Sequence, residues 1–237
     1  MKTFYLCLLM TLVLISCDSN IDDQITQESK TSENPVYKTG VEYHVSTSNP
    51  YDSAGVIHDM IAESYIGGTQ SAPRLLLAAK LDSIAFSTPG FISLDGNYIS
   101  LDTLSINAIM LDPELKLQQL LANSSLSNQA RLQAESFIDG ILNQLTLSKD
   151  EVILNNYISG YEATVVNLPN TQDKESLLIL SALTRHALQF AKKPKRKPRD
   201  KDWDISVACL VAGMSGSFNN PQNAIMNLLY TEILTNE

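Results

Sequence analysis

The chain has 237 residues, of which 44% are hydrophobic and 18% charged, and its formal net charge at pH 7 is −9. This composition is typical of a globular protein, and no apolar run of about 18 residues predicts a membrane-spanning helix. The acidic balance argues against general nucleic-acid binding, which needs a broad positive face, so no nucleic-acid partner is expected.

The first seventeen residues, MKTFYLCLLMTLVLISC, predict an export signal. Lys2 provides a positive start, and Phe4 to Ile15 form an apolar stretch too short to span a bilayer as a helix. The run Leu14-Ile15-Ser16-Cys17 resembles the lipobox of bacterial lipoproteins, whose signal is cleaved before a cysteine that becomes the lipid-modified N-terminus.

The resemblance implies a signal peptide at residues 1–16 and lipid attachment, including palmitate, at Cys17. The protein would then be a membrane-anchored lipoprotein of the bacterial cell envelope. Asp18, Asp22 and Asp23 partly resemble the surface-export signal of Bacteroidota lipoproteins, whereas Asp18 alone resembles an inner-membrane retention signal. The sequence therefore leaves open whether the domain is periplasmic or surface-exposed.

Residues 17–48 are polar and lack a sustained period, which predicts a flexible, lipid-anchored tether. Removal of residues 1–16 from the 237 leaves 221, enough for one domain with a sizeable core. We expect a single, mainly helical domain at residues 49–237. Cys7 leaves with the signal and Cys17 takes the lipid, so Cys209 has no cysteine with which to form an intramolecular disulfide.

The first half of this domain is predicted to contain two helices and a hairpin. An Asn-Pro turn leads to Asp52, a good N-cap, for a helix that Gly67-Gly68 ends. A second helix is expected from about Ala72 to Phe86. Asp95-Gly96 then separates two short β-rich runs, which predicts a small β-hairpin at 91–101.

The second half is predicted to be entirely helical. A short helix is expected to begin at Asp112-Pro113. Three longer helices are expected at 134–145, 150–165 and 173–191, and two last ones at 205–214 and 221–234. The segment LLILSAL within 173–191 is apolar nearly all round and is therefore expected to be central. The fold class is mainly α, an irregular helical bundle of about seven helices.

The candidate polar site is formed by Asp52, His58 and Asp59, whose imidazole and carboxylates could bind a metal or ligand or move a proton. A structural role competes with this hypothesis. His58 and Asp59 are adjacent on a helix and point about 100° apart, and Asp52 is expected to cap the backbone. His44 and His186 show no local partner pattern. Familiar nucleophile, zinc, P-loop and dinucleotide motifs are absent from the sequence, so no catalytic residue and no cofactor is predicted.

One basic strip stands out from the acidic remainder. It carries seven positive charges and one negative, a net +6, which leaves −15 for the rest of the chain. The strip could contact anionic headgroups, polyanionic glycans or an acidic protein, or it could be a solvated loop. Its candidate contact residues are Lys192, Lys193, Lys195, Arg196, Lys197, Arg199 and Lys201.

Small residues in Gly213-Met214-Ser215-Gly216 would permit either close helix approach or membrane association. The simpler interpretation is a helix end and turn in the core, because Asn219, Asn220 and Gln222 interrupt any extended apolar surface.

Four landmarks together resemble a family of uncharacterised Bacteroidota lipoproteins: NPYDSAGVIHD at 49–59, SALTRHALQF at 181–190, Trp203 and the following DISVACLVAGMSG. Members typically begin with an N-P-x-D-x-x-G-x-x-H-N-like motif, and Asp59 stands where Asn is usual. The resemblance implies no established activity.

The sequence thus favours a non-enzymatic binding or interaction module held to a membrane by its lipid. An envelope enzyme that uses Asp52, His58 and Asp59 is one alternative. A membrane-active protein that acts through its C-terminal helices is the other.

Overall fold

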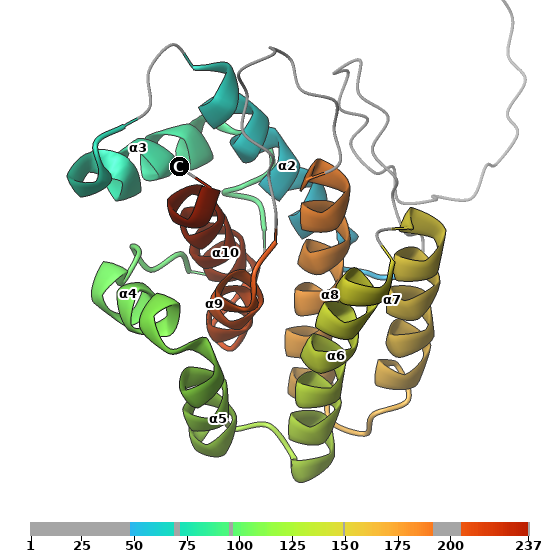
Figure 1. Cartoon of the computed structure of the whole chain (residues 1–237). Helices are drawn as coiled ribbons and strands as arrows, with labels where there is room; N and C mark the ends of the chain where they lie inside the picture. Colours follow the sequence, from blue (N-terminus) through green and yellow to red (C-terminus); the bar gives the residue numbers. More distant parts are fainter. Residues whose placement is uncertain (1–47, 69–71, 95–96, 149, 192–204, 237) are drawn as a thin grey trace, which may run out of the picture. The chain divides into compact units, whose positions relative to one another are not determined.

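The computed structural model describes residues 48–68, 72–94, 97–148, 150–191 and 205–236 (Figure 1). The described residues form nine helices and no strand, which confirms the mainly α class. The predicted signal peptide, Cys17, nearly all of the tether, the basic strip and Trp203 lie outside the described residues.

Most helices lie close to their predicted positions. They are α2 (Asp52–Gly67), α3 (Arg74–Ser87), α4 (Thr103–Leu111), α5 (Pro113–Asn123), α6 (Asn128–Leu147), α7 (Glu151–Val165), α8 (Thr171–Ala191), α9 (Val207–Ser217) and α10 (Pro221–Asn236). Local signals fix several ends. Asp112 caps α5 by accepting from the backbone N of Leu115, and Asn220 accepts from that of Asn223 at the start of α10.

The predicted hairpin at 91–101 is wrong for the part of it that the structure describes. Residues 88–94 form tight turns around Gly90, whose φ is 86°. The backbone of Ile99 forms hydrogen bonds with a side chain and not with a second strand. The Asn223 amide donates to the Ile99 carbonyl at 2.6 Å, and its own oxygen accepts from the Ile99 N–H at 3.2 Å. An α10 side chain therefore satisfies the backbone groups that a second strand would have paired.

Helix α4 was not predicted, and with it the described residues exceed the expected count of about seven helices. Asp102 begins this helix, because its Oδ1 accepts from the backbone N of Leu104 at 3.1 Å and of Ser105 at 3.2 Å. The hairpin expected at 91–101 ends directly before this aspartate.

Helix α8 lies at the centre of the domain, as LLILSAL predicted. Every residue from Ser176 to Leu188 is buried. Leu178 and Leu180 belong to an apolar cluster with α5, α6, α7 and α9, whereas Ile179 and Leu183 belong to a second with α2, α3 and α10. The helix thus joins two apolar cores, and burial of each such side chain contributes about 1.5–3 kcal/mol.

The small residues of α9 allow α10 to approach closely. A Cβ atom on Gly216 would lie 2.4 Å from the Asn223 carbonyl oxygen and 2.5 Å from the Ala224 Cα, and one on Gly213 would lie 2.9 Å from Leu228 Cδ1. Both helices are largely buried in the core. Within the described ranges, no helix has the length and apolar character needed to cross a membrane.

Candidate functional site: a buried charged cluster

Seven ionisable side chains form a continuous cluster between four helices, with carboxylates and bases in alternation. We call it the charged cluster, and each member is at most 4% exposed. In order of contact the members are Glu232 of α10, His58 and Asp59 of α2, His186 of α8, Asp52 of α2, Arg185 of α8 and Glu162 of α7.

Each histidine lies between two carboxylates. His58 Nε2 is 2.9 Å from Glu232 Oε2, and its Nδ1 is 3.1 Å from Asp59 Oδ1. His186 Nδ1 is 3.2 Å from Asp59 Oδ2, and its Nε2 is 3.4 Å from Asp52 Oδ2. Asp59 therefore bridges the two imidazoles, one with each oxygen.

Arg185 continues the cluster toward α7. Its Nη1 donates to Asp52 Oδ1 at 2.9 Å, and its Nη2 donates to Glu162 Oε2. The other oxygen of Glu162 accepts from Asn49 Nδ2 at 2.6 Å and from Ser181 Oγ at 3.0 Å. At this end of the cluster, the Glu162 carboxylate thus accepts hydrogen bonds from two neutral donors as well as from Arg185.

The helices bring these side chains together through sequence spacing. Asp52 and Asp59 are seven residues apart on α2, so they share one face of the helix. Gly55 lies between them, and a Cβ atom there would be 2.1 Å from His186 Cδ2. Glycine is therefore required at this position if the imidazole of α8 is to reach both aspartates.

The carboxylates determine the charge state of the histidines. Burial alone would lower the pKa of His58, but Glu232 and Asp59 together outweigh it and raise the pKa to about 9. Burial likewise opposes the rise in the pKa of His186, which Asp52 and Asp59 produce. Burial would raise the pKa of Asp59, but hydrogen bonds with both histidines hold it below its usual value.

The structure brings together all three residues of the predicted polar site, Asp52, His58 and Asp59. The expected N-cap is wrong, because Tyr51 stands at the cap position of α2 and the Asp52 carboxylate, inside the helix, contacts Arg185 and His186. His58 and Asp59, expected to point about 100° apart on the helix, are nevertheless in contact, with His58 Nδ1 3.1 Å from Asp59 Oδ1.

Four members of the charged cluster were missed from the sequence: Glu162, Arg185, His186 and Glu232. A usable signal existed for two of them. Arg185 and His186 lie in the helix predicted to be central, and charged groups in a core require partners. The landmarks NPYDSAGVIHD and SALTRHALQF supply five of the seven members, together with Asn49, Gly55 and Ser181.

Chemically, the cluster is suited to holding protons and fixing helices. In the described part of the chain, no three His, Cys, Asp or Glu side chains are arranged to hold a metal ion. Both ring nitrogens of each histidine already face carboxylate oxygens. With every member at most 4% exposed, the structure offers a substrate no surface on the cluster.

Cys209 of α9 lies beside the Glu232 end of the cluster. It is fully buried, and its Sγ is 3.2 Å from Ser206 Oγ. Burial, and then the nearby Glu232, raise the pKa of this thiol to about 11. The thiol is therefore a poor nucleophile at neutral pH.

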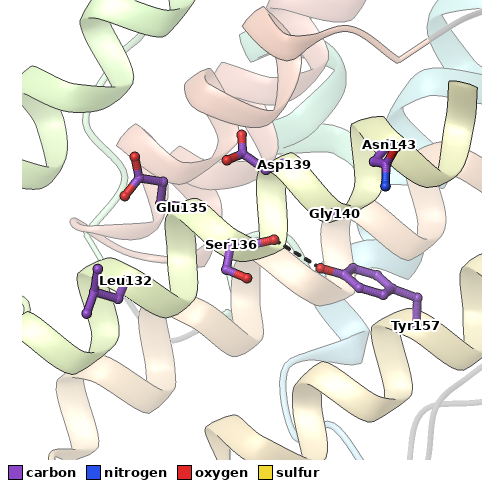
Figure 2. Close-up of a pocket in the computed structure, with 7 residues that line it drawn as sticks. All are labelled: Leu132, Glu135, Ser136, Asp139, Gly140, Asn143 and Tyr157. Carbon is purple, nitrogen blue, oxygen red and sulfur yellow. Dashed lines mark hydrogen bonds between the residues drawn. The ribbon is translucent and has the colours of Figure 1, made fainter.

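A separate surface pocket lies between α6 and α7 (Figure 2). Tyr157 points across it and donates to the Ser136 carbonyl at 3.0 Å. None of its lining residues belongs to the charged cluster. They are Leu132, Glu135, Ser136, Asp139, Gly140, Asn143 and Tyr157.

Comparisons of the chain with protein families, with characterised proteins and with solved structures find no match. The likeness to Bacteroidota lipoproteins consequently stays a prediction.

Proposed function

We propose that the protein is a lipid-anchored component of the bacterial cell envelope whose helical domain binds another protein and is not an enzyme. The N-terminal sequence supports the anchor at Cys17. The closure of the charged cluster supports a structural role for its histidines and carboxylates. The partner protein therefore binds to the outer surface of the domain.

The observation that carries this proposal is a set of strongly exposed leucines at the start of α3 and on α4. Leu75 is 92% exposed, Leu104 79% and Leu111 88%, and we call these three residues the α3–α4 face. Arg74 Nη2 donates to Asn107 Oδ1 at 2.8 Å, which ties the start of α3 to α4. Residues 104, 107 and 111 share one side of α4, so Leu104 and Leu111 flank Asn107. Exposed apolar groups of this kind favour association.

The charges beside this face favour a protein over a lipid surface. Asp102 and Asp112 lie at the two ends of α4, and both are exposed. Their carboxylates would repel anionic headgroups, whereas an apolar protein surface with a polar rim would accommodate them.

Site-specific photocrosslinking in intact cells tests the proposal. A crosslinking amino acid replaces Leu104 or Leu111, with exposed Gln118 and Gln129 as matched control positions. We expect the same protein to be captured from both leucine positions and from neither control. Equal capture from all four positions, or from none, would contradict a partner at the α3–α4 face.

The anchor is tested by substitution of the lipobox cysteine. Cys17→Ala should abolish labelling with a palmitate analogue and leave an uncleaved precursor. Labelling that persists in this variant would show that the lipobox assignment is wrong.

The basic strip is a second proposed contact, for anionic headgroups or glycans. Seven positive charges in ten residues support it. Binding of the full chain to vesicles with anionic lipid should weaken as salt rises and should fall when Lys195, Arg196 and Lys197 are changed to Gln. Salt-independent binding would argue against the strip as the contact.

An envelope enzyme is the second candidate function, and the carboxylate-flanked histidines favour it as an acid–base pair. It would require the cluster to open to substrate. A membrane-active protein would likewise require α9 and α10 to leave the core, in which both are buried. Dye release from liposomes by the full chain, compared with a Gly216→Ala variant, tests this last alternative.

A further inference from the structure

We propose that the charged cluster is a binding site for two protons in the core, one more on each of His58 and His186 than a neutral imidazole carries. We further propose that release of these protons is coupled to separation of α2 from α8 and α10. The ligand is thus the proton, and the site is independent of the proposed partner-binding face.

Hydrogen counting carries the first step. Four contacts join imidazole nitrogens to carboxylate oxygens, at 2.9, 3.1, 3.2 and 3.4 Å. Each contact needs one hydrogen, because two lone pairs facing each other repel. Two neutral imidazoles carry only two N–H groups, and ionised carboxylates carry none. Two further hydrogens are therefore required to complete the four contacts.

The charge balance places these hydrogens on the imidazoles. Four carboxylates and a single guanidinium would leave a formal charge of −3 in the core if both histidines were neutral. Two imidazolium ions reduce this to −1 and restore the alternation of sign along the cluster. The upward displacement of both histidine pKa values agrees with this assignment.

The groups that surround the histidines come from every helix packed at the cluster. Helix α2 provides Asp52 and Asp59, α7 provides Glu162, and α8 provides Arg185. Helix α10 provides Glu232, and α9 provides the Cys209 thiol beside it. Arg185 is already engaged by Asp52 and Glu162, so it cannot replace a positive charge lost at His58.

Loss of the protons would set lone pairs against carboxylates at three interhelical contacts. His58 joins α2 to α10, and His186 joins α8 to α2 twice. Since the unfolded histidines titrate near 6.5 and the folded ones higher, stability is fully present below 6.5. It is lost as pH rises through the folded pKa values, about 9 for His58.

The first test is urea unfolding of the full chain in mild detergent between about pH 7 and pH 8. With a pKa of 6.5 in the unfolded chain and about 9 in the folded one, His58 should raise the unfolding constant about 7-fold over this interval, and His186 should raise it further, toward the limit of about 100-fold for two whole protons. The interval ends below the ordinary pKa of the Cys209 thiol, about 8.5. His44→Gln is the matched control, because it removes the third histidine and should leave the pH slope unchanged. An unfolding constant that does not change with pH would overturn the proposal.

A second measurement needs no change in the cluster. The imidazole ¹⁵N chemical shifts of the His44→Gln protein at about pH 8 distinguish imidazolium from neutral rings. We expect two imidazolium signals. Neutral tautomers for both rings at this pH would overturn the assignment of the protons to His58 and His186.

Discussion

Arg185→Ala is expected to destabilise the domain severely. Arg185 is 4% exposed, and its guanidinium is shared by Asp52 and Glu162. Removal of one partner from a buried ion pair costs about 3–5 kcal/mol, because the remaining charge stays buried without compensation. Glu162 loses its cation here and keeps the neutral donors Asn49 and Ser181, whereas Asp52 keeps its contact with His186, so we expect a loss within this range. A typical domain has only about 5–15 kcal/mol of stability in total.

The free energy of unfolding, measured by urea denaturation and circular dichroism, checks this value. Arg74→Ala is the matched control, since Arg74 is exposed and donates to Asn107; we expect a loss below about 1 kcal/mol. The triple variant Arg185→Met, Asp52→Asn, Glu162→Gln should recover part of the lost stability, because no buried charge then lacks a partner at this end. A loss below about 1 kcal/mol in Arg185→Ala would refute the reasoning.

Three further results are expected. Because the pKa of Asp59 is held below its usual value, its contribution to stability is present above about pH 4 and is lost as pH falls through the folded pKa; acid titration of the unfolding free energy measures this. Gly216→Ala should lower the free energy of unfolding by about 1–3 kcal/mol or more, because the new Cβ meets the α10 backbone. Gly160→Ala is the control and should not destabilise the domain, because a Cβ there has nothing within 4 Å. Thermal unfolding that ranks the two variants otherwise would contradict the close crossing of α9 and α10. Cys209 should react with a disulfide reagent at neutral pH more than about 100-fold slower than an unburied thiol, and fast labelling of the native chain would contradict its burial.

Helix ends were predictable wherever one or two neighbouring residues determine them. Pro113 after Asp112, Pro221 after Asn220 and the pair Gly67-Gly68 all mark ends that the structure confirms. These signals act within a single turn of helix, so the sequence alone contains the relevant partners.

The hairpin failed because its backbone partner is far away in the sequence. Asp95-Gly96 is a sound local turn signal. The groups that pair with Ile99, however, belong to Asn223, 124 residues later. The local sequence predicts which turn a segment favours, but it does not identify the distant element that will hydrogen-bond with the backbone of that segment.

The charged cluster shows the same limit at the candidate site. Asp52 has a strong local preference for an N-cap, and tertiary contacts with Arg185 and His186, more than 130 residues away, override it. His186 had no patterned neighbour within α8, since its partners are both on α2. Its position in an apolar helix was the informative feature, because a buried imidazole there requires partners.

The measurement that tests the account most directly is the reactivity of His58 and His186 toward diethylpyrocarbonate in the native full chain. The central claim is that the charged cluster is a closed, protonated element of the core and not an active centre. Mass-spectrometric mapping should find both histidines modified far more slowly than a blocked histidine in solution, and equally fast only in urea. Modification of native His58 and His186 at the rate of the model compound would contradict the claim and would favour an open acid–base site.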